Sequence, residues 1–298
     1  MAGEHNHSQR GKSTLRLSPG PSPRIRWGER VPLEAVTDGV TIDLGAVRFA
    51  SPTLALRLAA SEAVHKAAGE PFKLLPPADR RVRAYLARAG LAEQMGVEPH
   101  SEAADVLVPI TRIEPRSEGV EATVRGLQEA IKFLPNGLVV SKEALVLALS
   151  ELGGNACSHG ENPHGTFILA QRLGPSRLVL AVGDIGVGIP THLGAALGAN
   201  GRAGEGKLIA KALEPGVTGV RDASPEEKRG SGLPRLLETI RDLGMPAAEL
   251  SIWSGVGRVS VRMRSQPAPR RSVVNVGSKT PGTWTEVVLA SRQAGIPI

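Results

Sequence analysis

The sequence predicts an α+β protein, in which helices pack on one side of a mixed sheet or a largely antiparallel one as a two-layer sandwich, preceded by a small α/β module. Strand and helix patterns alternate over residues 39–113, whereas residues 116–290 combine helical segments with several β runs. The 298 residues are 41% hydrophobic, which is enough for two ordinary cores. Because only 3% are aromatic, we expect Leu, Val, Ile and Ala to fill those cores.

Residues 1–38 are rich in Pro, Gly, Ser and Arg without a sustained period, which predicts a disordered basic segment. The GKST at 11–14 is no phosphate-binding loop, because Asn6 stands where that motif needs a glycine. The net charge of +7 is concentrated in the two ends of the chain. These ends lack interleaved aromatic side chains, so we expect solvated segments and no nucleic-acid partner, with binding through the ends as a separate alternative.

The module at 39–113 is predicted from two strands and two helix starts. Residues 40–44 alternate β-branched and polar side chains, and residues 71–75 give a second strand. Ser51 before Pro52 is a typical helix start, and Asp79 caps a second helix. This strand–helix–strand–helix order predicts a parallel pair of strands with a right-handed crossover.

Residues 104–113 form one more apolar strand or a linker, and we place the domain boundary near Glu114 and Pro115. The Gly/Ala-rich segment 191–229 has little regular pattern, which is typical of a long lid. Its Lys207, Lys211 and Arg221 could touch phosphates, although a solvated lid is the simpler interpretation. The remaining elements are predicted as helices at 118–133, 145–159 and 233–243 and strands at 166–173, 177–182, 249–253, 258–263 and 284–289.

The predicted helix at 145–159 carries a line of polar side chains beside its apolar stripe. Glu151, Asn155 and His159 recur at intervals of four. The side-chain oxygen of Asn155 suits a hard cation such as Mg²⁺, and Glu151 could deprotonate a nucleophile. We interpret His159 as a helix-end residue and Cys157, the only cysteine, as a small buried hydrophobe.

A second motif places Asp184 at the end of a predicted strand, followed by Gly186 and Gly188. A carboxylate there can accept a hydrogen bond from a donor such as the exocyclic amine of adenine, and glycines let backbone approach a flat ligand. A dinucleotide fold is excluded because Thr191 stands where its third glycine belongs. A third motif, Gly230-Ser231-Gly232-Leu233, precedes a helix and would expose N–H groups to phosphate oxygens.

Together these motifs resemble the ATP-binding domain shared by DNA gyrase, the chaperone Hsp90, two-component histidine kinases and MutL, the GHKL or Bergerat-fold family. A fourth motif, Gly282-Thr283 before a β run, completes the resemblance. The resemblance implies the Bergerat fold for residues 116–290, with ATP and Mg²⁺ as cofactors. The implied roles are Mg²⁺ binding by Asn155, adenine binding by Asp184 with Thr283, a site shaped by Gly186 and Gly188, phosphate binding by Gly230, Ser231, Gly232 and Leu233, and base catalysis by Glu151.

The segment VTIDLGAVRFASPTLALRLAA resembles the STAS domain of anti-sigma-factor antagonists. In that family a partner kinase phosphorylates a Ser or Thr that precedes a helix. Ser51 and Thr53 fall at about that position, although the family's Asp-Ser-Ser-Gly-like turn is replaced by Ser-Pro-Thr-Leu. A helix cap is the simpler role for Ser51.

The short ATP-binding domain resembles the anti-sigma-factor serine kinases more than the histidine kinases, because His65 is followed by Lys66 instead of an acidic residue. We expect transfer of the ATP γ-phosphate to a Ser or Thr of a regulatory partner, a STAS-type antagonist or a sigma-like factor, in a bacterial partner switch. The alternative is an ATP-gated protein-binding module without turnover. We expect a cytoplasmic location and no membrane partner, because no apolar run reaches the roughly 18 residues that a spanning helix needs. A homodimer is left open.

Overall fold

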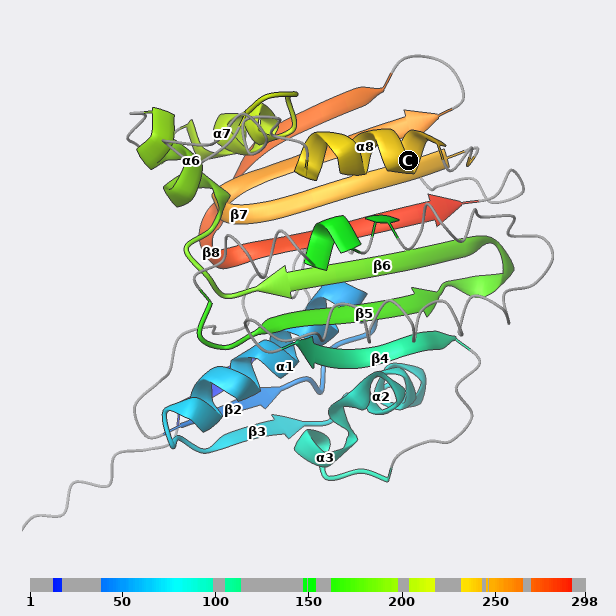
Figure 1. The fold of residues 1–298 in the computed structure, drawn as a ribbon. Helices are drawn as coiled ribbons and strands as arrows, with labels where there is room; N and C mark the ends of the chain where they lie inside the picture. Colours follow the sequence, from blue (N-terminus) through cyan, green and yellow to red (C-terminus); the bar gives the residue numbers. More distant parts are fainter. Residues whose placement is uncertain are drawn as a thin grey trace, which may run out of the picture.

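The computed structural model describes residues 13–17, 39–98, 105–113, 147–148, 150–153, 162–197, 204–217, 232–242, 245, 247–264 and 269–290. Within these ranges the strands form a three-stranded sheet and a five-stranded sheet (Figure 1). The helices predicted at 118–133, and at 145–159 beyond residue 153, lie outside the described residues. The described part confirms an α+β protein.

The small sheet is parallel, with the order β1-β2-β3, and consists of β1 (Ser13–Arg16), β2 (Val40–Asp43) and β3 (Phe72–Leu75). Helix α1 (Pro52–Ala67) connects β2 to β3, which confirms the predicted parallel pair with a helix between its strands. Strand β1 lies inside the segment expected to be disordered. It is held by backbone pairing with β2 and by the fully buried side chain of Leu17 just after it.

Both predicted helix caps are present in the structure. The Ser51 hydroxyl accepts a hydrogen bond from the Leu54 N–H at 3.1 Å, and the Asp79 carboxylate accepts from the Arg81 N–H at 2.9 Å. Asp79 opens α2 (Arg80–Leu86), which continues into η2 (Ala87–Leu91) and α3 (Ala92–Met95). Gly90, with a φ of 113°, breaks the helix there, but the chain resumes a helical turn beyond it.

The large sheet has the order β4-β5-β6-β8-β7, and all its neighbouring strands are antiparallel. Of the two predicted arrangements, mixed and largely antiparallel, the described strands confirm the antiparallel one. The elements are β4 (Val106–Ile113), β5 (Thr166–Arg172), β6 (Arg177–Asp184), β7 (Ala247–Arg264) and β8 (Arg270–Ala290). Strand β4 pairs with β5, so the segment that the sequence left open as a strand or linker belongs to the large sheet.

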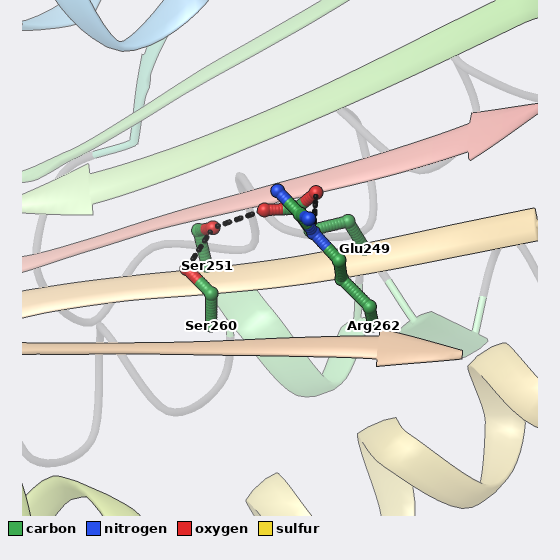
Figure 2. A network of polar contacts seen from close by, with 4 residues as sticks. All are labelled: Glu249, Ser251, Ser260 and Arg262. Atoms are coloured by element: carbon green, nitrogen blue, oxygen red, sulfur yellow. Dashed lines mark hydrogen bonds and ion pairs between the residues drawn. The ribbon is translucent and has the colours of Figure 1, made fainter. Parts of the chain in front are cut away.

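Strand β7 is a hairpin that reverses at Gly255, whose φ is 58°. The hydroxyl oxygens of Ser251 and Ser260, nine residues apart, lie within 2.9 Å of each other across its two arms (Figure 2). Strand β8 also has two arms, because residues 283–290 pair with β6 and with the first arm of β7, whereas residues 270–275 pair with the second. The separate strands predicted at 249–253, 258–263 and 284–289 are thereby confirmed.

Both faces of the large sheet are covered, because α6 to α8 lie on one face, as the predicted two-layer sandwich requires, and α1 of the small module lies on the other (Figure 1). One face packs against α6 (Ile189–Leu197), α7 (Glu205–Ala212) and α8 (Gly232–Asp242). Helices α6 and α7 occupy part of the segment predicted to lack regular structure. The other face packs against α1, whose leucines share a core with Phe167, Trp253 and Trp284 of the sheet. Among the described helices, none has the length and apolar character needed to cross a membrane.

Candidate functional site

Asp184 is a buried carboxylate at the end of β6, with only 3% of its surface exposed. It follows Leu178, Leu180 and Val182 on the face of the sheet that the helices α6 to α8 cover, because side chains alternate along a strand. The backbone N–H of Gly186 donates to Asp184 Oδ1 at 2.8 Å. The strand end thus aims a carboxylate into the layer between the sheet and the helices.

Burial raises the pKa of Asp184 from its ordinary value of 3.8 to about 7, although the N–H groups of Gly186 and Thr283 act in the opposite direction. Burial disfavours the charged form, and no described cation compensates it. Buried carboxyl groups with a pKa near neutrality are common at functional sites. The charged form of such a group is stabilised by a ligand that donates a hydrogen bond to it.

The raised pKa predicts a stability change that Asp184→Asn removes. Between about pH 4 and pH 7 the Asp184 carboxyl keeps its proton in the native state, whereas the unfolded chain has lost it. The stabilisation of the native state by this protonated carboxyl is therefore fully present below pH 4 and is lost as the pH rises through 7. We expect the free energy of unfolding of the wild type, measured against that of Asp184→Asn, to fall by about 3 kcal/mol from pH 5 to pH 8. Urea unfolding of both proteins at the two pH values measures it, and parallel pH profiles would refute the assigned pKa.

Ser254 connects the backbone segments around Asp184. Its fully buried hydroxyl donates to the Gly282 carbonyl at 2.7 Å and accepts from the Ile189 N–H at 3.0 Å. It also lies 3.2 Å from the Thr283 hydroxyl. Sequence reasoning missed Ser254, although a serine directly before the turn at Gly255 was a signal for a polar side chain at a strand end.

The predicted glycine and threonine positions gather around Asp184. Thr283 is paired with Asp184 in the register of β6 and β8. Gly188 has a φ of 80° and lies so close to Ser254 and Gly282 that a side chain there would collide with both. Asp184, Gly186, Gly188, Ser254 and Thr283 therefore form one cluster, which we call the Asp184 site.

Glu151 lies on the same face of the sheet, in the helical residues 150–153 (Figure 1). Its neighbour Leu152 shares the core with Leu236 of α8. The Glu151 carboxylate is paired with Arg235 of α8, with 3.3 Å between Oε1 and Nη1. Burial raises the pKa of Glu151, and Arg235 opposes this shift. Sequence reasoning missed Arg235, which follows the predicted phosphate-binding motif by two residues.

Several predicted site residues lie outside the described part of the chain: Asn155, Cys157, His159, Arg221, Gly230 and Ser231. Gly232 begins α8, and Leu233 packs partly buried against the core. Within the described ranges, no group of three or more His, Cys, Asp or Glu side chains could hold a metal ion. The metal role assigned to Asn155 therefore stays a prediction.

Helix α7, in the predicted lid segment, is attached to the β7 hairpin. The Glu205 carboxylate accepts a hydrogen bond from the Val256 N–H in the hairpin turn, and the Gly206 N–H donates to Asn275 Oδ1 at 3.4 Å. Lys211 forms an exposed ion pair with Glu214 at 3.5 Å, which agrees with a solvated helix face. The end of α7 that carries Glu205 is thus fixed beside the sheet.

Ser51 and Thr53 lie on the opposite face of the large sheet from Asp184. Thr53 is 9% exposed, and its hydroxyl donates to Glu286 Oε2 at 2.8 Å. Glu286 and Trp284 face α1, whereas Thr283 and Thr285 face the other layer. Both hydroxyls are thus engaged in holding the start of α1, and the sheet separates them from the Asp184 site. A cavity of about 210 Å³ lies beside them.

The cluster around Asp184 can bind a flat, hydrogen-bond-donating group. The carboxylate accepts hydrogen bonds, the Thr283 hydroxyl can donate and accept, and Gly186 is partly exposed and carries no side chain, whereas Gly188 is buried and Ser254 is already engaged with Gly282 and Ile189. Glu151 and the start of α8 lie on the same face of the sheet. The arrangement therefore suits a ligand with a planar donor at one end and an anionic group at the other.

Comparisons with known proteins give remote similarities only. No protein-family model matches the chain, and no curated protein does. Among solved structures, it is similar to a mycobacterial sensor histidine kinase, with 18% identity, 52% of this chain and 75% of that chain covered, and a TM-score of 0.28. It is also similar to the B-subunit of DNA gyrase from Myxococcus xanthus (10% identity, 58% and 44% covered, TM-score 0.29) and to the histidine kinase domain of a blue-light-activated histidine kinase from Erythrobacter litoralis (15% identity, 80% and 86% covered, TM-score 0.26). Similarity at this level assigns no function.

Proposed function

We propose that this chain binds ATP, with adenine at the Asp184 site. The observation that carries the proposal is the buried carboxylate of Asp184, held by Gly186 and Thr283 next to the Ser254 hydroxyl. A buried carboxylate with a raised pKa is stabilised by a ligand that donates to it, as the exocyclic amine of adenine would. Thr283 supplies a second polar group for a ring nitrogen.

The phosphates would lie toward the N-terminus of α8. Gly232 opens this helix of eleven residues, and unpaired backbone N–H groups at a helix start attract phosphate oxygens. Gly230, Ser231 and Leu233 complete this proposed phosphate-binding segment. Asn155 would hold Mg²⁺ through its side-chain oxygen, and the bound ion would offset the negative charge of the phosphates.

For the chemistry, we propose transfer of the γ-phosphate to a Ser or Thr of a regulatory partner protein, a STAS-type antagonist or a sigma-like factor. Glu151 would accept the proton of the attacking hydroxyl as the oxygen–phosphorus bond forms and the bond to ADP breaks. Its raised pKa and partial burial bring its proton affinity closer to that needed at neutral pH. Arg235 would hold this carboxylate in place.

A second candidate function is an ATP-gated binding module without turnover. The ion pair between Glu151 and Arg235 favours it, because a carboxylate engaged by a guanidinium is a weaker base. In this case ATP would change the affinity for a partner by binding one arrangement of the helices better than another. The two functions share the Asp184 site and differ only at Glu151.

Glu151→Gln separates the two candidate functions. If Glu151 is the base, the variant should bind ATP with wild-type affinity and lose phosphate transfer by about 10²- to 10⁴-fold. Isothermal titration calorimetry measures the binding, and radiolabelled ATP with Mg²⁺ and candidate partner proteins measures the transfer. The matched control is Glu249→Gln, because Glu249 forms a similar half-buried pair with Arg262 at 3.0 Å on the opposite face of the sheet (Figure 2).

Equal transfer by wild type and Glu151→Gln would remove Glu151 as the base. Tight ATP binding by wild type without transfer or hydrolysis, under every partner condition, would favour the ATP-gated module. The Glu249→Gln control should keep both binding and transfer, so a loss in both variants would point to a general loss of stability.

A further inference from the structure

Helix α1 carries a line of polar side chains that the sequence analysis overlooked. Thr53, Arg57, Ser61 and His65 recur at intervals of four, and all are at most 9% exposed. The helix lies between the small sheet and the large sheet, with its apolar residues buried in the shared core. Polar groups buried in this way need partners, so their contacts show what the helix is fixed to.

Arg57 is the charged member of this line and is 2% exposed. Its Nη2 donates to Thr280 Oγ1 at 3.4 Å, and the guanidinium carbon lies 5.1 Å from the centre of the Trp284 ring. Thr280 and Trp284 are themselves buried, at 1% and 0% exposure. The guanidinium of Arg57 thus contacts both ends of the short segment 280–284.

The same segment forms one wall of the Asp184 site. Trp284 Nε1 donates to the Pro281 carbonyl at 2.8 Å, which closes the segment on itself. Gly282 lies against the backbone of Asp184, and its carbonyl accepts from the Ser254 hydroxyl. Because side chains alternate along β8, Trp284 faces α1 while Thr283 faces the Asp184 site.

The geometry points to Arg57 as a positioning residue for the Asp184 site. By holding Thr280 and the Trp284 ring, it fixes the backbone at Gly282 and Thr283 in the form that the ligand meets. Nucleotide affinity should therefore depend on how α1 of the N-terminal module, residues 39–113, packs against the large sheet. Bound nucleotide should in turn stabilise this packing. This inference rests on the proposed ATP site and adds the N-terminal module to it.

The test is a titration of the full chain with ATP and Mg²⁺ for the variants Arg57→Met and Arg57→Lys. Methionine keeps the length and apolar stem of Arg57 but removes its donors and charge, so we expect the Kd for ATP to rise about tenfold. Lysine keeps a cation at the Trp284 ring and a donor for Thr280, so we expect affinity within about threefold of wild type. Unchanged affinity in Arg57→Met would overturn the inference.

His65→Gln is the matched control for a merely structural role. His65 lies on the same line of α1, but its ring contacts the Ser61 carbonyl at 2.7 Å and Phe72 of β3 instead of segment 280–284. We expect this variant to lower the melting temperature without changing the Kd for ATP. If His65→Gln weakens ATP as much as Arg57→Met does, the effect is general destabilisation and the inference fails.

Two further measurements test the role of Arg57 if Arg57→Met does not fold or if the wild type does not bind ATP. If Arg57→Met does not fold, Thr280→Val removes the hydroxyl that accepts from Arg57 and should raise the Kd by about threefold. If the wild type binds no ATP, the proposed function fails, and hydrogen exchange then tests Arg57 separately. The amides of residues 280–284 should exchange at least tenfold faster in Arg57→Met than in wild type, and equal exchange would refute the positioning role.

Discussion

Asp184→Asn is expected to weaken ATP binding by about 100-fold or more, because charged hydrogen bonds in buried sites contribute several kcal/mol. Asp184 Oδ1 accepts from the Gly186 N–H, the Thr283 N–H also donates to the carboxylate, and the exocyclic amine of adenine would donate to it as well. The amide replaces one of these acceptors with a donor, so at least one N–H group would meet another donor. Isothermal titration calorimetry with ATP and Mg²⁺ measures the change.

The control for Asp184→Asn is a check that the variant still folds. The substitution keeps the shape of the side chain and removes the burial of a charge, so the far-ultraviolet circular dichroism spectrum should match that of wild type and unfolding should stay cooperative. Wild-type ATP affinity in a folded Asp184→Asn protein would show that the nucleotide, if bound at all, lies elsewhere.

Gly282→Ala is expected to lower the free energy of unfolding by about 3 kcal/mol or more. The loss has two causes, because alanine is strained in a left-handed backbone conformation and its Cβ would overpack this site. Gly282 has a φ of 70°, and a Cβ there would collide with the backbone of Asp184 and Ile185. The same collision displaces Thr283, so ATP affinity should fall as well. Urea unfolding and calorimetry on the same protein measure both effects.

Gly174→Ala is the matched control for Gly282→Ala. Gly174 has a similar φ of 64°, but a Cβ there would meet no atom within 4 Å, and the residue lies in the turn between β5 and β6. Only the backbone cost of about 1–2 kcal/mol applies, and ATP affinity should not change. Equal losses of stability in the two variants would mean that a Cβ at position 282 adds no steric cost against the Asp184 backbone.

Local sequence signals predicted the elements that carry the site. The caps Ser51 and Asp79 and the β runs predicted at 166–173 and 177–182 depend on neighbouring residues, so each could be predicted from the sequence to within two residues of its observed end. The glycines after Asp184 likewise marked the end of β6. A strand end followed by a glycine turn is a local property, and it located the Asp184 site before any packing was known.

Properties that depend on distant partners could not be predicted in the same way. The antiparallel pairing of every described strand in the large sheet follows from which segments meet, and no local pattern fixes that. Arg235 and Ser254 acquire their roles only when α8 reaches Glu151 and β7 reaches Gly282. One signal was available but overlooked: beside its line of polar side chains, α1 has apolar residues on its other sides along the first three turns, which is typical of a helix buried on both sides.

The most direct test of adenine recognition by Asp184 is a calorimetric titration of the wild-type chain with ATP and, separately, with GTP, each with Mg²⁺. Guanine presents a carbonyl oxygen where adenine presents an amine, so the Asp184 carboxylate would face an acceptor instead of a donor. We predict saturable binding of ATP and at least about 100-fold weaker binding of GTP. Equal affinity for the two nucleotides, or no saturable binding of ATP, would contradict it.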